Sequence, residues 1–256
     1  MSEGINYYDI YDKPHPYKGL LIYPVLVKDY CEFSSCIDCL NYNKNETNDI
    51  KILQMSYLDY LLFLDTIQPD VQAYIKLFHL LCLVLRFPLD SNEHSIEFRK
   101  DTNNNTIFFI VDGVEFLSQD FDEIRKIILL QHCMEYEEWI LDEKIKKALA
   151  ETAEFNKKKS FEFADFEEQT ILYHLYTGLD YEKIYDLTIR KFTKGLQILF
   201  RKEDYKLLKG AELAGTVTFK EEIKHPFSHI EPRGAFDGLV VKDADKTINT
   251  LKESLK

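Results

Sequence analysis

Three cysteines stand close together near the start of the chain, in the stretch CEFSSCIDCL. Cys31, Cys36 and Cys39 have the spacing C-x4-C-x2-C, which is that of the first three ligands in plant-type iron–sulfur proteins. A cluster needs four thiolates from a loop that can wrap around it, and the spacers here contain no glycine. The two candidates for a fourth ligand, Cys82 and Cys133, lie in apolar helical patterns where free cysteine is ordinary core filler. We therefore predict buried thiols rather than a cluster or a zinc site.

The other residues that could perform chemistry do not form a complete motif. His225 and His229 are four apart, as two metal ligands on one helix face would be, but Pro226 interrupts a regular helix between them. The sequence contains no Walker A motif, no G-x-G-x-x-G, no H-E-x-x-H and no G-x-S-x-G. We predict that the protein is not an enzyme and has no catalytic residues, no metal and no cofactor.

Composition limits the class of protein. The chain has 256 residues, of which 45% are hydrophobic and 14% aromatic, enough for a packed core. A formal net charge of −12 makes nucleic acid an unlikely partner, because phosphate binding needs clustered Lys and Arg. The most apolar segment, 71–87, carries the basic residues Lys76, His79 and Arg86 and is short for a membrane span, so we predict a buried core helix and no membrane association. An odd number of cysteines and the absence of a secretory signal pattern favour a reducing cytoplasm.

Hydrophobic periodicity predicts an α+β fold that is predominantly helical, with a small antiparallel β-meander near residues 95–118. The meander is indicated by alternation in SIEFRKD, a β-rich run in TIFFIV, and Asp112-Gly113, a strong hairpin signal, before VEFL. A strand within 19–27 is expected to join it. Helices are predicted at 49–67 and 71–87, and another is expected to begin with a capping box formed by Asp120 and Glu123.

The predicted domain organisation has four parts. Residues 1–18 form an N-terminal arm, 19–135 an α+β part that includes the meander, 136–230 a helical part with helices near 142–156 and 164–176, and 231–256 a polar C-terminal tail.

The segment 167–202 has the layout helix, glycine turn, short helix, helix. Asp180 is expected to cap the short helix, and Thr188 the third helix, whose apolar face contains Phe192, Leu196 and Leu199. This layout is that of a helix-turn-helix motif, with a basic third helix in the position of a recognition helix. It is equally that of a compact three-helix packing unit. Gly195, in the middle of the third helix, argues against the recognition helix.

The same region resembles a known family. TGLDYEKIYDLTIRKFTKGLQIL, followed by AELAGTVTFKEEIKHPFSHI, resembles the C-terminal helical half of tail assembly chaperones and other tail-morphogenesis proteins of Gram-positive bacteriophages. The shared features are a Thr-Gly turn, a short helix ending in a hydrophobic-Thr step, a helix that opens with Arg-Lys-Phe, and a small-residue turn at Ala214-Gly215. The resemblance implies a non-enzymatic protein that binds a phage tail protein such as the tape-measure protein.

We therefore expect a phage tail-morphogenesis protein that acts in the host bacterial cytoplasm, with residence in the virion as the alternative. Partner binding is predicted for Tyr181, Arg190, Lys191 and Lys194, because aromatic and Arg side chains dominate interface energetics. The competing hypothesis is a DNA-binding regulator that uses the helix-turn-helix-like segment at 167–202.

Overall fold

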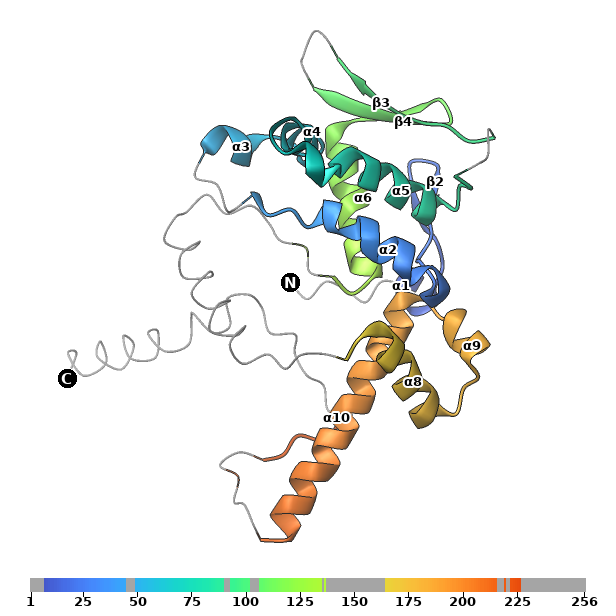
Figure 1. Ribbon diagram of the computed structural model, residues 1–256, viewed down its shortest axis with the longest axis vertical. Helices are drawn as coiled ribbons and strands as arrows, with labels where there is room; N and C mark the ends of the chain where they lie inside the picture. The colour runs from blue at the N-terminus through green and yellow to red at the C-terminus, as the bar shows by residue number, and fades with distance from the viewer. Residues whose placement is uncertain are drawn as a thin grey trace, which may run out of the picture. The chain divides into compact units, whose positions relative to one another are not determined.

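The computed structural model describes residues 7–44, 49–89, 93–101, 106–134, 136, 164–215, 219 and 222–226 (Figure 1). The chain divides into two compact units, Met1–Glu138 with Phe166–Phe200, and Trp139–Asp165 with Arg201–Lys256. The predicted helix at 142–156, the turn at 103–105 and the polar tail at 231–256 lie outside the described residues. The described elements confirm an α+β fold that is mainly helical and contains small antiparallel sheets.

The N-terminal segment folds into a short helix and a hairpin. Helix α1 spans Tyr7–Ile10, and strand β1, His15–Tyr17, pairs antiparallel with β2, Leu20–Ile22. The two linking residues have positive φ angles, 44° at Lys18 and 89° at Gly19, as a type I′ turn requires. The expectation that a strand within 19–27 joins the meander was wrong. The strand ends before Pro24, which has no N–H to donate, and it belongs to a separate two-stranded sheet.

A series of helices follows, and one prediction is corrected here. The structure has two helices, α3 at Ile50–Gln54 and α4 at Tyr57–Ile67, where periodicity predicted one over 49–67. The interruption occurs because Ser56 leaves the helical conformation to cap α4, accepting a hydrogen bond from Asp59 N–H at 3.1 Å. Between the N-terminal hairpin and α3, the described residues form the 3₁₀ turn η1 at Val27–Asp29, helix α2 at Tyr30–Cys36 and the 3₁₀ turn η2 at Ile37–Leu40.

Helix α5, Ala73–Leu85, is the core helix that the apolar segment 71–87 predicted. The 3₁₀ turn η4, Pro69–Val71, precedes it, and the carboxylate of Asp65 accepts the N–H groups of Ala73 and Tyr74 at 2.5 and 3.0 Å. More than half of the α5 side chains are buried, against α2, η2 and α4. No helix in the described part of the chain is long and apolar enough to cross a membrane.

The predicted β-meander is confirmed. Strands β3 (Ile96–Lys100), β4 (Ile107–Val111) and β5 (Val114–Phe116) form one antiparallel sheet in the order β3-β4-β5. The β4–β5 turn consists of Asp112 and Gly113, whose φ angles of 48° and 81° give the expected primed turn. Alternate residues of β4 are buried, which turns one face of the sheet toward the core.

Helix α6, Ser118–Gln131, covers that face, but its cap differs from the prediction. Asp120 is the third residue of the helix and not its cap; its carboxylate accepts the N–H of Leu117, the N-cap, at 3.0 Å. The same carboxylate accepts the Tyr17 hydroxyl at 2.9 Å and pairs with the Lys18 ammonium at 2.6 Å. Asp120 therefore attaches the start of α6 to the N-terminal hairpin, a role that a local capping pattern does not reveal.

The C-terminal part of the first unit contains α8 (Phe166–Thr177), α9 (Tyr181–Tyr185) and the beginning of α10 (Ile189–Leu213). The three helices enclose a core of their own with one contribution from η1, and the expected apolar face of the third helix is part of it. Asp180 is the N-cap residue of α9, but its side chain makes no capping hydrogen bond. The buried members of this core are Val27, Tyr173, Ile184, Phe192 and Leu196.

Gly195 has a packing role in this core. A Cβ atom at this position would lie 2.6 Å from both Cε2 and Oη of Tyr173, closer than van der Waals contact permits. Tyr173 is 9% exposed, so its ring has little room to move away. Glycine is therefore required here by the close approach of α8, although it is a poor helix former.

We expect Gly195→Ala to lower the free energy of unfolding by about 1–3 kcal/mol, because overpacking outweighs the gain in helix propensity. Gly210→Ala in the same helix is the matched control. An added Cβ there meets nothing within 4 Å, so propensity alone acts and stability should rise by up to about 1 kcal/mol. Urea unfolding measures both changes. A rise in stability for both variants would contradict the packing argument, and Tyr173→Leu should reduce the cost of Gly195→Ala.

Candidate functional site

The site predicted from the sequence lies where α10 begins, and a short backbone pairing fixes that point. Val27 N–H donates to Leu187 C=O and Ile189 N–H donates to Val25 C=O, both at 2.9 Å. Leu26 and Thr188 form an antiparallel β-bridge between these two hydrogen bonds. The N-terminal segment is thus joined directly to the first residues of α10.

Thr188 organises the first turn of α10. Its hydroxyl oxygen accepts the Lys191 N–H at 3.2 Å, which confirms the predicted cap. The hydroxyl also donates to Asp12 Oδ1 at 3.0 Å, and the other oxygen of Asp12 lies 2.5 Å from the Lys191 ammonium. One carboxylate from the N-terminal segment therefore binds both the cap residue and the first lysine of the helix.

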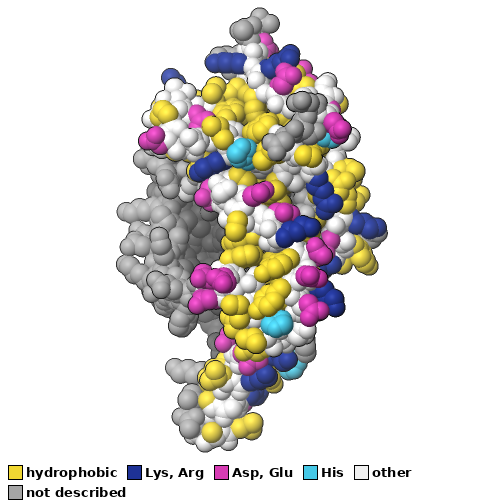
Figure 2. Space-filling model, turned by 45° about the vertical axis from the view of Figure 1, so that its right-hand side comes forward, with side chains coloured by type: hydrophobic (Ala, Val, Ile, Leu, Met, Phe, Trp, Pro, Cys, Tyr) yellow, Lys and Arg dark blue, Asp and Glu magenta, His cyan; other side chains and the backbone are white. Residues whose placement is uncertain are grey.

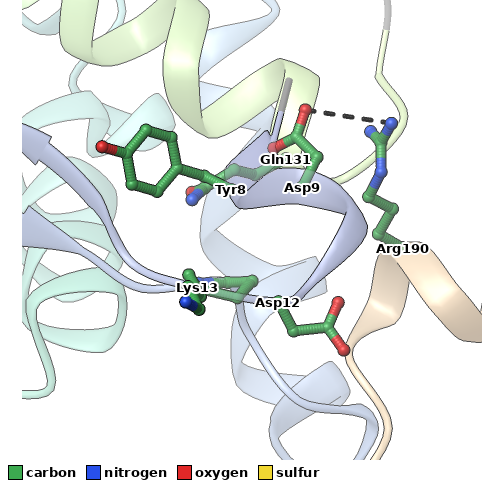
Figure 3. Close-up of a pocket in the computed structure, with 7 residues that line it drawn as sticks. Tyr8, Asp9, Asp12, Lys13, Gln131 and Arg190 are labelled. Carbon is green, nitrogen blue, oxygen red and sulfur yellow. Dashed lines mark ion pairs between the residues drawn. The ribbon is translucent and has the colours of Figure 1, made fainter. Parts of the chain in front are cut away.

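Arg190 is bound from two further directions, and Figure 3 draws one of them, the ion pair with Asp9. Its Nη1 donates to the backbone carbonyl of Leu130, near the end of α6, at 2.7 Å. Its Nη2 lies 3.8 Å from Asp9 Oδ2, on α1. Both side chains line a depression that encloses almost no internal volume and therefore offers no room for a small-molecule ligand. The lining residues are Tyr8, Asp9, Asp12, Lys13, Pro24, Gln131 and Arg190.

His132, just after α6, connects the same junction to the interior. Its Nε2 accepts the N–H of Val25 at 3.0 Å and its Nδ1 donates to the Ile128 carbonyl at 2.6 Å, which fixes the neutral tautomer with the proton on Nδ1. Burial, together with the smaller effect of the Arg190 guanidinium, lowers the pKa of His132 to about 4. The imidazole is therefore a structural connector at neutral pH and not an exposed acid or base.

The four residues predicted to bind a partner have different environments. Arg190 and Lys191 come together at the junction, where their charged groups contact carboxylates of this chain. Lys194 is exposed one turn further along α10, and Tyr181 lies on α9 with its ring stacked on His174 at a centroid distance of 4.6 Å. Contact of any of them with a partner stays a prediction.

A more open surface lies on α8 and α9, and of its residues sequence reasoning singled out Tyr181 alone. We define the α8–α9 surface as Ile171, Leu175, Tyr181 and Tyr185, which are all exposed, with His174 between the two helices. Figure 2 turns this side of the chain toward the viewer and shows hydrophobic side chains gathered there. The run ILYHLY, 171–176, contains more apolar residues than one buried helix face can hold. This excess of apolar residues is the feature of the sequence from which the surface could have been predicted.

Of the three clustered cysteines, Cys36 and Cys39 are buried as predicted, but Cys31 is exposed on α2, so the prediction of a buried thiol was wrong for Cys31. Cys36 ends α2 and its thiol donates to the Glu32 carbonyl at 3.1 Å, while Cys39 in η2 is fully buried. Burial raises the pKa of the Cys36 thiol to about 12 and that of Cys39 in the same direction, which disfavours the thiolates that metals bind. Among the described residues, no group of three or more His, Cys, Asp or Glu side chains is placed to hold a metal ion.

Comparison with known proteins bears on the C-terminal half. Residues 156–231 match the family model described as YomV second domain, a phage-derived protein family. The matched range includes α8, α9 and α10 and contains the two stretches that resemble tail-morphogenesis proteins. No curated protein and no solved structure matches the chain. The match is consistent with a phage protein, and it does not extend to tail assembly in particular.

The contacts of Arg190 predict a stability role that can be separated from binding. Arg190→Met keeps the apolar stem but removes the hydrogen bond to Leu130 and the ion pair with Asp9, so unfolding free energy should fall by about 1–3 kcal/mol. Lys194→Met, on the exposed side of the same helix, should change it by less than about 0.5 kcal/mol. Denaturant unfolding compares the two. Equally small effects would show that the Arg190 contacts do not stabilise the fold.

The neutral state of His132 predicts a loss of stability in acid. The folded pKa of about 4 lies below the ordinary value of 6.5, so the folded state binds fewer protons and its stability falls as pH decreases from 6.5 to 4. Between pH 7.5 and 4.5 this one group should remove about 2–3 kcal/mol. Urea unfolding of the wild type and of His132→Gln at both pH values isolates the effect, because the other titrating groups are shared. Parallel pH dependences in the two proteins would refute it.

Proposed function

We propose that this chain is a non-enzymatic phage tail-morphogenesis protein, an assembly chaperone or tail-associated factor, that binds another tail protein through the helical part formed by α8, α9 and α10. It would act in the host cytoplasm, or remain with the virion. The matched phage-derived family and the resemblance to tail-morphogenesis proteins fall on the same residues and support this proposal.

The observation that carries the proposal is the apolar character of the α8–α9 surface. Leu175 is 70% exposed and Ile171 40%, one helical turn apart on α8, and the two tyrosines of α9 are about as exposed as Ile171. Large apolar and aromatic side chains that gather on an exposed face are typical of protein–protein interaction sites. The packed depression near Arg190 and the high pKa values of the buried thiols give no comparable support for catalysis.

A DNA-binding regulator remains the second candidate, because α8, α9 and α10 follow one another in helix-turn-helix order. In such motifs the first residues of the third helix reach the bases. Here Thr188 and Ile189 are buried, and Arg190 and Lys191 bind carboxylates of the N-terminal segment. These contacts would have to break before the helix could contact DNA, so the protein-binding function is favoured.

The proposal is tested by mixing the purified chain with individually purified tail proteins, including segments of the tape-measure protein, and measuring complex formation by size-exclusion chromatography. We expect one of them to form a complex that Leu175→Ser weakens at least tenfold, because the substitution removes exposed apolar area from the interface. Ile75→Ser is the matched control, since Ile75 is also exposed but lies on α5.

A DNA-binding titration at several salt concentrations accompanies this experiment. Salt-sensitive DNA binding at micromolar affinity or tighter, together with no complex with any tail protein, would reverse the ranking of the two functions.

A further inference from the structure

The charges around the α8–α9 surface have one predominant sign. Glu167 precedes Ile171 by four residues, so it lies next to it at the start of α8. Asp180, Glu182 and Asp186 are exposed before, within and after α9. Together these four carboxylates form what we call the acidic rim.

In the part of the chain that the structure describes, lysines form ion pairs with two of these carboxylates. Lys183 lies 3.7 Å from Asp180, and Lys28 lies 3.5 Å from Asp186, with all four side chains at least half exposed. Exposed ion pairs of this length are weak and leave the carboxylates accessible to a stronger partner. The rim therefore keeps a net negative charge next to an apolar centre.

The helix geometry arranges the apolar groups in a row. Ile171 and Leu175 are four residues apart and face the same way, while the rings of His174, Tyr181 and Tyr185 continue from α8 onto α9 at centroid distances of 4.6 and 6.2 Å. Tyrosine side chains have only two χ angles and therefore lose little conformational entropy on binding, which makes them effective contacts.

We propose that the α8–α9 surface binds a basic amphipathic helix of the partner protein. The apolar face of that helix would contact Leu175 and the α9 tyrosines, and its Lys or Arg residues would lie against the acidic rim. This inference rests on the proposed function and specifies the chemistry of its partner. The occupant follows from charge complementarity, because an acidic or neutral apolar helix would leave the rim carboxylates desolvated without partners. Nucleic acid and anionic lipid are disfavoured by the same rim, since both carry phosphates.

The test uses two 18-residue model peptides with leucines at identical helical positions, one with lysine and the other with glutamate at the remaining positions. Fluorescence anisotropy with the full chain should show the Leu/Lys peptide binding at least tenfold more tightly than the Leu/Glu peptide, with an affinity that falls as salt increases. Leu175→Ser and, separately, Tyr185→Ser should each weaken Leu/Lys binding at least fivefold. The paired reversal Glu182→Lys and Asp186→Lys should weaken it and flatten its salt dependence.

Matched controls distinguish this surface from the general acidity of the chain. Ile75→Ser removes an exposed apolar group from α5, and Glu115→Lys reverses an exposed charge on β5; both should bind the Leu/Lys peptide as the wild type does. Equal affinity for the two peptides, or Leu/Lys binding that Leu175→Ser leaves unchanged, would overturn the inference. So would a dimer, seen by analytical ultracentrifugation, that Leu175→Ser dissociates, because the occupant would then be a second copy of this chain.

The two proposals can fail separately. A complex with a tail protein that depends on Leu175, combined with no preference for the Leu/Lys peptide, would refute the partner chemistry and retain the function. A clear preference for the Leu/Lys peptide without any tail-protein complex would refute the tail-morphogenesis function and retain the chemistry of the surface.

Discussion

The short antiparallel pairing between residues 25–27 and 187–189 is the constraint on which the arrangement of the first unit depends. Two backbone hydrogen bonds and one β-bridge place the start of α10 against the N-terminal segment. Asp12 then reaches Thr188 and Lys191, and Val25 presents its N–H to His132. Each of these side-chain contacts requires the two segments to lie side by side, because hydrogen bonds and ion pairs act only over short distances.

This arrangement changes the role that the basic residues at the start of α10 can have. From the sequence, Arg190 and Lys191 are the strongest candidates for binding an external anion or a protein. In the folded chain their charged groups are engaged by Asp9, Asp12 and a carbonyl of α6. The excess charge that faces outward beside α8 and α9 is negative instead. Clustered basic residues in a sequence therefore indicate that carboxylates bind them, and those carboxylates can belong to the same chain.

How well a feature could be predicted from the sequence depended on how far apart along the chain the residues that form it lie. The meander, its Asp112-Gly113 turn and the Thr188 cap depend on residues within a few positions of each other, and all three were predicted correctly. The break at Ser56 was missed because continuous apolar periodicity concealed a local capping interaction. The contacts of Arg190 and His132 come from residues 60 or more positions away, or from backbone groups, and no local pattern contains that information. The α8–α9 surface was detectable only as a surplus of apolar residues, which does not say which of them remain exposed.

The same pairing has a consequence for how the chain is made. Asp12 and Thr188, which bond to each other, are 176 positions apart, so the N-terminal segment leaves the ribosome long before its partner has been synthesised. At a bacterial elongation rate of about 5–20 residues per second, the interval is on the order of ten seconds or more. Until residues 187–189 are translated, the backbone groups that pair with them, Val25 C=O and Val27 N–H, are available to water or to other partners. His132 can be translated only after most of that interval has passed. Contacts of such long range form slowly and favour exposure to misfolding or to other proteins. The final structure of this unit is therefore reached only after translation has passed α10.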